Sequence, residues 1–151
     1  MDELDRKLLA ELQRDATQAY AVLGRAVGLS AGAAHERVRK LREQGVIRRT
    51  TVDVDPVAAG RGVAAFVMVE ASAWMGEAPV REALEALPEV VEAHVIAGPA
   101  TLLVKLRTPT TEALQGSLRR LFAIDGVSST QTIVVLETFF ERSLDTREVP
   151  A

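Results

Sequence analysis

Apolar side chains recur at helical spacing in three segments at the start of the chain. They predict helices over residues 2–14, 19–27 and 31–44. Gly28 and Gly45 come directly after the second and third segments, where a helix end favours a residue that tolerates left-handed backbone geometry. The apolar stripes, in chain order, are Leu4, Leu8, Leu9 and Leu12; Val22, Leu23 and Ala26; and Ala34, Val38 and Leu41.

The residues around the third helix indicate how it begins and which elements come after it. Ser30 stands just before it, and a serine caps a helix because its hydroxyl accepts a hydrogen bond from a free backbone amide of the first turn. Leu29 is expected to fill the core after the preceding turn. Beyond the helix, Val46-Ile47 and Thr51–Val54 are β-branched and predict two short strands. Residues 1–53 are therefore expected to form one small unit.

After residue 53 the period of the apolar positions changes. Residues 54–62 contain Asp-Pro and Gly-Arg-Gly sequences, which are typical of a linker. Beyond them β-branched runs and helical stripes alternate in the order βαββαβ. This order predicts an α+β domain over residues 63–142, a ferredoxin-like sheet with both helices on one face, before a tail at 143–151. The expected elements are a strand over 63–72, a helix marked by Val80, Ala83, Leu84 and Leu87, strands over 90–97 and 102–107, a helix marked by Leu114, Leu118, Leu121 and Phe122, and an extended run over 127–140.

The strands of this predicted sheet are apolar on both sides. Phe66 and Met68 alternate with the valines of the first strand. In a later strand, Leu103 points to the face opposite that of Leu102 and Val104. Two helices can cover only one face of the sheet, and soluble monomers rarely expose a contiguous apolar patch. We therefore expect a second copy of the chain to cover the other face through a two-fold interface.

The composition excludes several kinds of chemistry. The chain has 151 residues, of which 48% are hydrophobic and 26% charged, and this balance is typical of a globular protein. The absence of cysteine excludes disulfides, thiolate nucleophiles, iron–sulfur clusters and Cys-containing zinc sites. His35 and His94, the two histidines, stand far apart in sequence. No apolar run approaches the ~20 residues that a membrane span needs. We expect a cytoplasmic protein with neither metal nor cofactor.

The charge is distributed unevenly along the chain. The formal net charge of −3 argues at first against nucleic acid. Residues 1–62, however, contain 11 Lys and Arg against 9 Asp and Glu, whereas residues 63–151 contain 7 against 12. Between Arg25 and Arg49, seven basic residues stand beside only two acidic ones. Such an asymmetry suggests contact with nucleic acid, although a basic run can also be a solvated helix face.

Several short motifs together resemble one known family. They are LDRKLL at residues 4–9, VGLS at 27–30, ERVRKL at 36–41, GVI at 45–47, Gly98 after the second predicted strand and VVLE at 134–137. In this order and spacing they are similar to the Lrp/AsnC family, the feast/famine transcription regulators of bacteria and archaea. The resemblance covers about residues 2–142. It implies a winged helix-turn-helix, dimers built by the C-terminal sheets, octamers of four dimers, and an amino acid or related metabolite that alters assembly or DNA affinity.

The third predicted helix is the candidate DNA-reading element. Reading helices expose small or polar residues at their N-terminal end and place cations beside the DNA backbone. Gly32, His35 and Arg39 lie at i, i+3 and i+7 on the outward face of this helix. The expected roles are helix capping and a phosphate bond for Ser30, contacts to base edges for His35 and Arg39, and phosphate contacts for Arg37, Lys40 and Arg42. Arg48, with Arg49 and Thr50, stands where a wing would approach the backbone.

The sequence departs from the family pattern in two places within this domain. The second helix begins with Ala19-Tyr20-Ala21-Val22, where relatives usually have a polar cap and an acidic residue, and it contains Gly24. A glycine inside a helix costs about 1 kcal/mol relative to alanine. The reading helix also begins with small residues, which predicts weak direct base readout and more dependence on DNA shape and on several half-sites bound together.

The resemblance also implies where a small-molecule effector would bind. Family effectors lie near the turn between the second and third strands and meet the last strand of a neighbouring subunit. The corresponding residues are Gly98, Pro99, Ala100, Thr101 and Leu102 in the turn and Thr130, Gln131 and Thr132 in the last strand. Many relatives have an aspartate at the position of Thr101, and threonine cannot neutralise an ammonium group. Either backbone carbonyls and the last strand bind the ammonium, or the effector is not a free amino acid. A third alternative is that this loop is only a hairpin turn and that the protein binds no small molecule.

Two other classes of protein fit the sequence less well. A metabolite-binding or scaffold protein with decayed DNA binding is one alternative, because the second helix departs from the family pattern. A decarboxylase-like enzyme related to the family is the other. The chain offers no paired carboxylates in an apolar setting, no Ser/His/Asp set in a plausible order and no glycine-rich phosphate loop. We therefore expect a regulator and not an enzyme.

Overall fold

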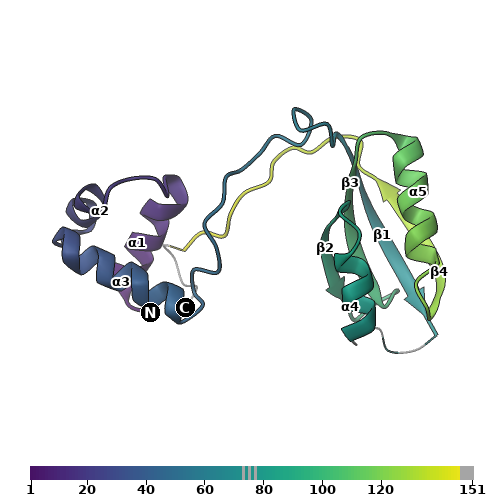
Figure 1. The fold of residues 1–151 in the computed structure, drawn as a ribbon, viewed down its shortest axis with the longest axis horizontal. Helices are drawn as coiled ribbons and strands as arrows, with labels where there is room; N and C mark the ends of the chain where they lie inside the picture. Colours follow the sequence, from purple (N-terminus) through teal and green to yellow (C-terminus); the bar gives the residue numbers. More distant parts are fainter. Residues whose placement is uncertain (73, 75, 77, 147–151) are drawn as a thin grey trace. The chain divides into compact units, whose positions relative to one another are not determined.

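The computed structural model describes residues 1–72, 74, 76 and 78–146, and the chain divides into two compact units (Figure 1). The first unit contains Met1–Val52 together with the C-terminal segment that begins at Phe140, and the second contains Asp53–Phe139. The sequence placed residues 140–142 with the sheet, whereas the structure groups them with the first unit. Of the predicted tail, residues 147–151 lie outside the described part of the chain.

Three helices build the first unit: α1 (Glu3–Arg14), α2 (Tyr20–Val27) and α3 (Ala31–Glu43). Their predicted ends are confirmed. Gly28 ends α2 with φ of 76°, and the Ser30 hydroxyl accepts a hydrogen bond from the Ala33 amide at 3.2 Å at the start of α3. At the start of α1, Asp2 and Asp5 form reciprocal side-chain to backbone hydrogen bonds of 2.8 and 2.9 Å. A capping box of this kind pairs backbone amides that the helix itself leaves without partners.

The core of this unit is small and joins all three helices. Its fully buried members come from each of them, and partly buried side chains, Leu29 and Ile47 among them, pack around it. The predicted stripe of α3 is confirmed, because its three residues are buried. Burial of a full Leu or Val side chain stabilises a fold by roughly 1.5–3 kcal/mol. The buried residues of this cluster are Leu8, Leu23, Ala34 and Val38.

Gly24 fills a requirement of this core. A Cβ atom added to it would lie 2.6 Å from the Leu29 carbonyl oxygen and 2.9 Å from that of Ser30. Real Cβ atoms essentially never approach backbone this closely, so the start of α3 can pack against α2 only because this residue is glycine. Gly24 therefore lowers the intrinsic stability of α2, but it allows the close contact between α2 and the start of α3.

The two predicted strands of a wing are absent. Val46-Ile47 and Thr51–Val54 have neither helix nor strand assigned, and Val52 and Val54 are exposed. β-branched residues favour extended backbone, but a two-stranded pair without further strands or a helix against it is marginally stable. Residues 46–54 accordingly form no strand, although Ile47 packs against the core of the three helices.

The C-terminal segment returns to α1. The Gln13 side-chain amide donates a hydrogen bond to the Leu144 carbonyl oxygen at 2.8 Å, and its carbonyl oxygen accepts one from the Thr146 hydroxyl at 3.1 Å. One glutamine thus holds both a backbone group and a side chain of this segment. Since Leu144 is exposed, these polar contacts attach the segment without adding it to the core.

The second unit has the predicted βαββαβ order. Its four strands form one antiparallel sheet in the order β2-β3-β1-β4, and α4 and α5 lie on the same face of it (Figure 1). The predicted ferredoxin-like arrangement is therefore confirmed. The last strand ends at residue 134, short of the predicted residue 140. The elements are β1 (Val63–Ala71), α4 (Ala78–Glu85), β2 (Val90–Val95), β3 (Leu102–Thr108), α5 (Thr111–Phe122) and β4 (Val127–Val134).

The two faces of the sheet differ in cover. On the helix side, alternate residues of β1 and β3 form one buried core with three leucines of α4 and α5. The opposite face carries Phe66, Met68, Leu103 and Ile133, whose side chains are partly or half exposed. No helix in the described residues is long and apolar enough to cross a membrane.

Candidate DNA-binding surface and effector site

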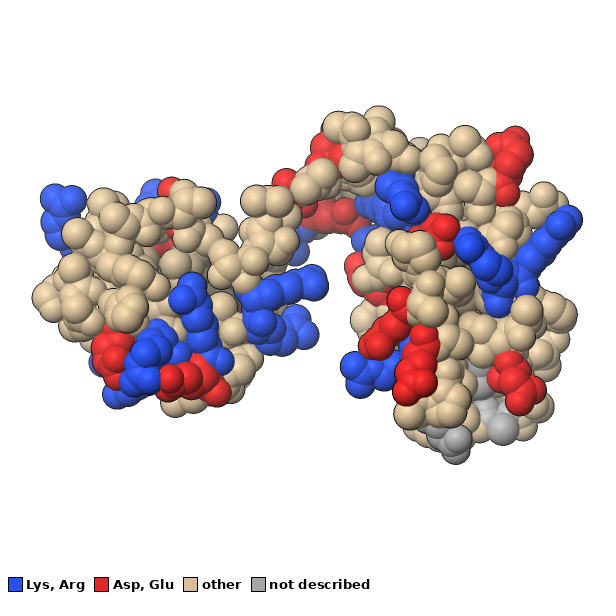
Figure 2. Space-filling model, in the orientation of Figure 1, with Lys and Arg blue, Asp and Glu red and all other residues tan. Residues whose placement is uncertain are grey.

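The eight predicted DNA-binding residues all lie on α3, at its N-cap or shortly after it. Seven of them are exposed, namely Ser30, Gly32, His35, Arg39, Lys40, Arg42 and Arg48, whereas Arg37 is partly buried. Figure 2 shows Lys and Arg side chains spread over the visible face of the helical unit, with Asp and Glu side chains beside some of them. The buried stripe of α3 fixes the helix to the unit, and this leaves its polar side open to solvent.

Arg39 is held by acidic residues of its own helix. Its guanidinium donates hydrogen bonds to the Glu36 carboxylate at 2.5 and 2.9 Å and also contacts Glu43. The Glu36 contact, followed by Glu43, raises the pKa of Arg39, and the same contact lowers the pKa of Glu36. Exposed ion pairs of this kind stabilise a protein little because water and salt screen them. A phosphate or base can therefore compete for Arg39 at small cost.

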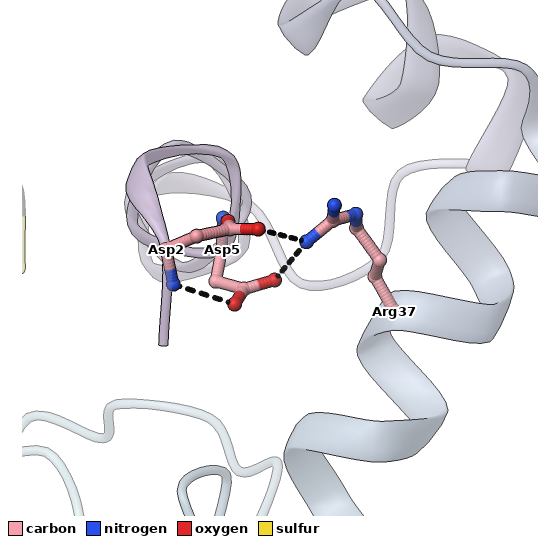
Figure 3. Close-up of polar contacts among 3 residues, drawn as sticks. All are labelled: Asp2, Asp5 and Arg37. Atoms are coloured by element: carbon pink, nitrogen blue, oxygen red, sulfur yellow. Dashed lines mark hydrogen bonds and ion pairs between the residues drawn. The ribbon is translucent and has the colours of Figure 1, made fainter.

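Arg37 has a different environment. Its Nη1 atom lies 2.7 Å from Asp2 Oδ2 and 2.8 Å from Asp5 Oδ1, two carboxylates at the start of α1 (Figure 3). The Asp5 side chain is only 15% exposed and that of Arg37 33%. The two carboxylates raise the pKa of Arg37; the pKa of Asp2 is lowered first by the Asp5 amide hydrogen bond and then by Arg37. Arg37 therefore joins the reading helix to α1, a contact that the sequence did not predict.

His35 packs against the second helix. Its ring meets that of Tyr20 edge to face, with centroids 4.8 Å apart. Such a pair contributes about 0.5–1.5 kcal/mol beyond burial of its area. Tyr20 is the first residue of α2, so the departure from the family pattern at this position supplies an aromatic support for a predicted base-reading side chain.

Arg48 lies beyond α3 in the stretch without regular structure. It is exposed, as are its neighbours Arg49 and Thr50. Because the predicted wing strands are absent, no regular element fixes the direction of these three side chains. Their expected contact with the DNA backbone stays a prediction.

The predicted effector turn adjoins the middle of the sheet. The Thr101 amide donates to the Val69 carbonyl oxygen at 2.9 Å, and the Thr101 carbonyl oxygen accepts from the Ile96 amide at 3.0 Å. Leu102, the last residue of the predicted set in this turn, is 3% exposed and belongs to the core under the helices. Its backbone can still approach a ligand, but its side chain is committed to the core.

The three predicted residues of β4 do not share one face. Thr130 and Thr132 pair with Val69 and Val67, whose side chains lie in the helix-side core. Gln131 pairs with Met68 and lies on the open face. Side chains of paired residues point to the same side of a sheet and those of successive residues to opposite sides. The sheet therefore separates Gln131, on the open face, from Thr130, Thr132 and Leu102, on the helix side.

Glu70 is a charged residue near the turn that is not among the residues predicted from the sequence. It comes directly after Val69 in β1 and pairs with Ser129 of β4, whose hydroxyl donates a hydrogen bond to Glu70 Oε2 at 2.8 Å. A signal was present in the sequence, because Glu70 is the single charged residue of the segment VAAFVMVEA. The Glu70 carboxylate thus stands at the end of the open face. It is one residue from Val69, whose carbonyl oxygen accepts the hydrogen bond from the turn.

Two cavities of the second unit lie away from the predicted effector turn. One of about 370 Å³ lies between α4 and β2, and of the predicted effector residues it touches only Leu102. Another of about 640 Å³ lies between α4 and α5, beside Trp74. Neither cavity encloses the predicted effector site.

Comparisons with known proteins agree in both halves of the chain. Residues 1–42 match the model of the AsnC-type helix-turn-helix domain, and residues 64–145 match that of the Lrp/AsnC ligand binding domain. The HTH-type transcriptional regulator FL11 of Pyrococcus horikoshii is 37% identical over 150 residues, covering 99% of this chain and 96% of its own. The regulatory protein AsnC of Escherichia coli is 32% identical over 145 residues, covering 95% of each chain.

Solved structures show the same similarity in three dimensions. The structure of E. coli AsnC aligns with a TM-score of 0.87 at 32% identity and covers 96% of this chain and 98% of that one. A feast or famine regulatory protein from M. tuberculosis, complexed with L-methionine, aligns with a TM-score of 0.85 at 28% identity, covering 93% of this chain and 95% of that one.

Proposed function

The chain belongs to the Lrp/AsnC family of DNA-binding transcriptional regulators, and from this premise we propose that α3 reads DNA and that the second unit binds an amino acid effector. The observation that carries the proposal is the division of α3 into a buried stripe and an exposed basic side. Arg39 and His35 would contact base edges, and Lys40, Arg42 and Arg48 would contact phosphates, as in helix-turn-helix docking.

We propose two roles for Arg37, a structural contact between α1 and α3 and a contact to a DNA phosphate. Its two carboxylate partners support a structural role at the α1–α3 contact. The same ion pairs hold its guanidinium at the surface of the helix, where one side remains partly exposed. A phosphate contact by Arg37 would therefore need no unfolding of α1, only an added acceptor.

The open face of the sheet supports assembly. Phe66, Met68, Leu103 and Ile133 form an apolar patch on this face beside Lys105 and Gln131, and no helix of the described residues covers it. A second copy would bury this patch through a two-fold interface. Four such dimers would form an octamer, as the family resemblance implies. Sedimentation velocity on the full chain tests this proposal, and a monomer at micromolar concentration would contradict it.

The effector is proposed to be an amino acid bound at the 98–102 turn. The support is the position of this turn beside β1 and β4, together with the methionine complex of the M. tuberculosis relative. The ligand would alter assembly or DNA affinity by binding one state better than the other, because a ligand that binds all states equally shifts nothing. Because the protein would act on DNA, we propose a cytoplasmic location, and we propose no catalytic role.

A retardation assay tests the regulator as a whole. DNA from upstream of the protein's own gene is compared with a shuffled sequence of equal length and base composition, with and without L-methionine. We expect the upstream DNA to bind at lower protein concentration and methionine to shift the midpoint. Equal affinity for both DNAs would refute specific reading by α3, whereas an unchanged midpoint with methionine would refute methionine as the effector and leave DNA reading standing.

The alternative of decayed DNA binding has lost its main support. That alternative depended on the unusual start of α2 and on Gly24 within it. Both have a structural explanation, since Gly24 allows the close approach to α3 and Tyr20 packs on His35. The unusual residues therefore belong to an intact helix-turn-helix.

A further inference from the structure

The residues at one end of the open face suggest how the proposed effector is recognised. In the register of β1 with β3, Val69 pairs with Leu102, and the Thr101 amide donates to the Val69 carbonyl oxygen at 2.9 Å. This hydrogen bond places the backbone of Thr101 against Val69, and Glu70 is the next residue of β1. Glu70 therefore stands beside the turn.

The side chain of Glu70 points to the open face. Val69 belongs to the helix-side core, and successive residues of a strand alternate between faces. Glu70 therefore faces the open side, and so does Ser129, its partner on β4. A carboxylate and a hydroxyl group thus stand together at this end of the face.

The Glu70 carboxylate is oriented and retains acceptor capacity. The Ser129 hydroxyl donates to its Oε2 atom at 2.8 Å. An ionised carboxylate has two oxygens and about four acceptor positions, so this one bond leaves room for the donors of an ammonium group. Glu70 is exposed in the single chain and stands at the end of the open face next to the turn, so a ligand bound at the turn can reach its free acceptor positions.

We infer that Glu70 binds the α-ammonium group of the effector and takes the place of the acidic residue that the turn lacks at Thr101. This inference rests on the proposed function, in which the turn binds an amino acid. It resolves the choice left open by the sequence, because the missing negative charge is supplied from the neighbouring strand. The ligand class is a free α-amino acid with an unmodified ammonium group.

Isothermal titration of the full-length chain tests the inference with two probes. They are L-methionine and its α-hydroxy analogue, which keeps the carboxylate and the thioether but replaces the ammonium group by a hydroxyl. Hydrogen bonds to charged groups are strong, so the wild type is expected to bind methionine about tenfold or more tighter than the analogue. Glu70→Gln is expected to weaken the affinity for methionine by a similar factor. Its affinity for the analogue should stay within about twofold of the wild-type value.

Glu82→Gln is the matched control, because Glu82 is an exposed residue of α4, on the other side of the sheet, and the substitution removes the same charge. It is expected to change neither affinity. If Glu70→Gln keeps the preference for methionine, the inference is wrong while the proposed effector stands. If the wild type gives no heat with methionine, methionine binding at this turn and the Glu70 assignment fail together.

Discussion

Arg37 Nη1 lies 2.8 Å from Asp5 Oδ1, so an ion pair joins the reading helix to the first turn of α1 across 32 positions of sequence. The same nitrogen contacts Asp2 at 2.7 Å. One cation therefore links two acidic residues that also cap α1, and the start of α1 and the middle of α3 depend on each other.

Arg37 and Arg39 should respond differently to alanine substitution. Arg37→Ala leaves Asp5 largely buried without its cation, so we expect the melting temperature to fall by several degrees. Arg39→Ala removes only exposed pairs and should leave the melting temperature unchanged while weakening operator binding by roughly tenfold to a hundredfold. Calorimetry and a retardation assay on both variants check this, with the oligomer monitored by size-exclusion chromatography. Equal melting temperatures for the two variants would refute the structural role of Arg37.

Acid should destabilise the first unit through Asp2. Its pKa is lowered from the ordinary value of 3.8, chiefly by the hydrogen bond from the Asp5 amide and next by Arg37. A carboxyl with a lower pKa in the folded state stabilises that state above its unfolded pKa, and this contribution is lost as pH falls through the folded value. We expect the unfolding midpoint to decline below about pH 4. Asp2→Asn keeps a good N-cap but removes the charge. The unfolding midpoint of this variant, followed by circular dichroism, should therefore fall less steeply with decreasing pH than that of the wild type.

Two glycine substitutions should change the free energy of unfolding in opposite directions. Gly24→Ala places a Cβ atom 2.6 Å from the Leu29 carbonyl oxygen, and overpacking of this kind costs about 1–3 kcal/mol. Gly116→Ala, at an exposed position of α5, meets nothing within 4 Å and should stabilise by up to about 1 kcal/mol through helix propensity. Denaturant unfolding measures both. A Gly24→Ala variant as stable as the wild type would mean that α2 and α3 can separate without cost.

DNA affinity should depend strongly on salt. If about 4 to 6 cations per dimer contact phosphates, the slope of log affinity against log salt is expected near −4 to −5. Lys40→Ala removes one such cation from each subunit and should reduce the slope by about 2 per dimer. Titrations by fluorescence anisotropy between low and moderate salt give the slope. An affinity independent of salt would contradict the phosphate contacts assigned to Lys40 and Arg42.

Charge on the open face should dissociate the assembly. Ile133 is 49% exposed on β4 and belongs to the apolar patch that a second copy is proposed to cover. Ile133→Asp would bury an unpaired carboxylate in that interface, which is costly. We expect the sedimentation coefficient to fall to that of a smaller species at equal concentration. Glu82→Asp, on the helix side, is the control that should leave assembly unchanged.

Helix ends could be predicted from the sequence, because they depend on residues close to one another in the chain. Gly28 ends α2 and Ser30 caps α3 as the sequence indicates, because the first is a backbone preference and the second a hydrogen bond three residues away. Contacts across the chain were not predictable in this way. Nothing near Arg37 in sequence indicates that Asp2 and Asp5 receive its guanidinium, and nothing near Gly24 indicates that two carbonyl oxygens at the start of the next helix lie against it.

The strands show the same limit. Thr51–Val54 has the composition of a strand, but a strand also needs a partner, and composition does not supply one. In β4, alternation could have placed Thr130 and Thr132 on one side and Gln131 on the other. Only the register with β1 shows which side carries the helices, and it moves the two threonines to the core side. The register of β1 with β3, together with the Thr101–Val69 hydrogen bond, places Glu70 beside the turn.

The return of the C-terminal segment to Gln13 has a topological consequence. Residues 53–139 are inserted into a helical unit whose own sequence is discontinuous, since that unit resumes at Phe140. Truncation after the sheet would therefore remove a part of the DNA-reading unit, and the sensing unit can be excised only with two cuts. A shortened chain in which a flexible loop replaces residues 53–139 would keep both contacts of Gln13, and a fluorophore attached near Leu144 would report on α1 and not on the sheet.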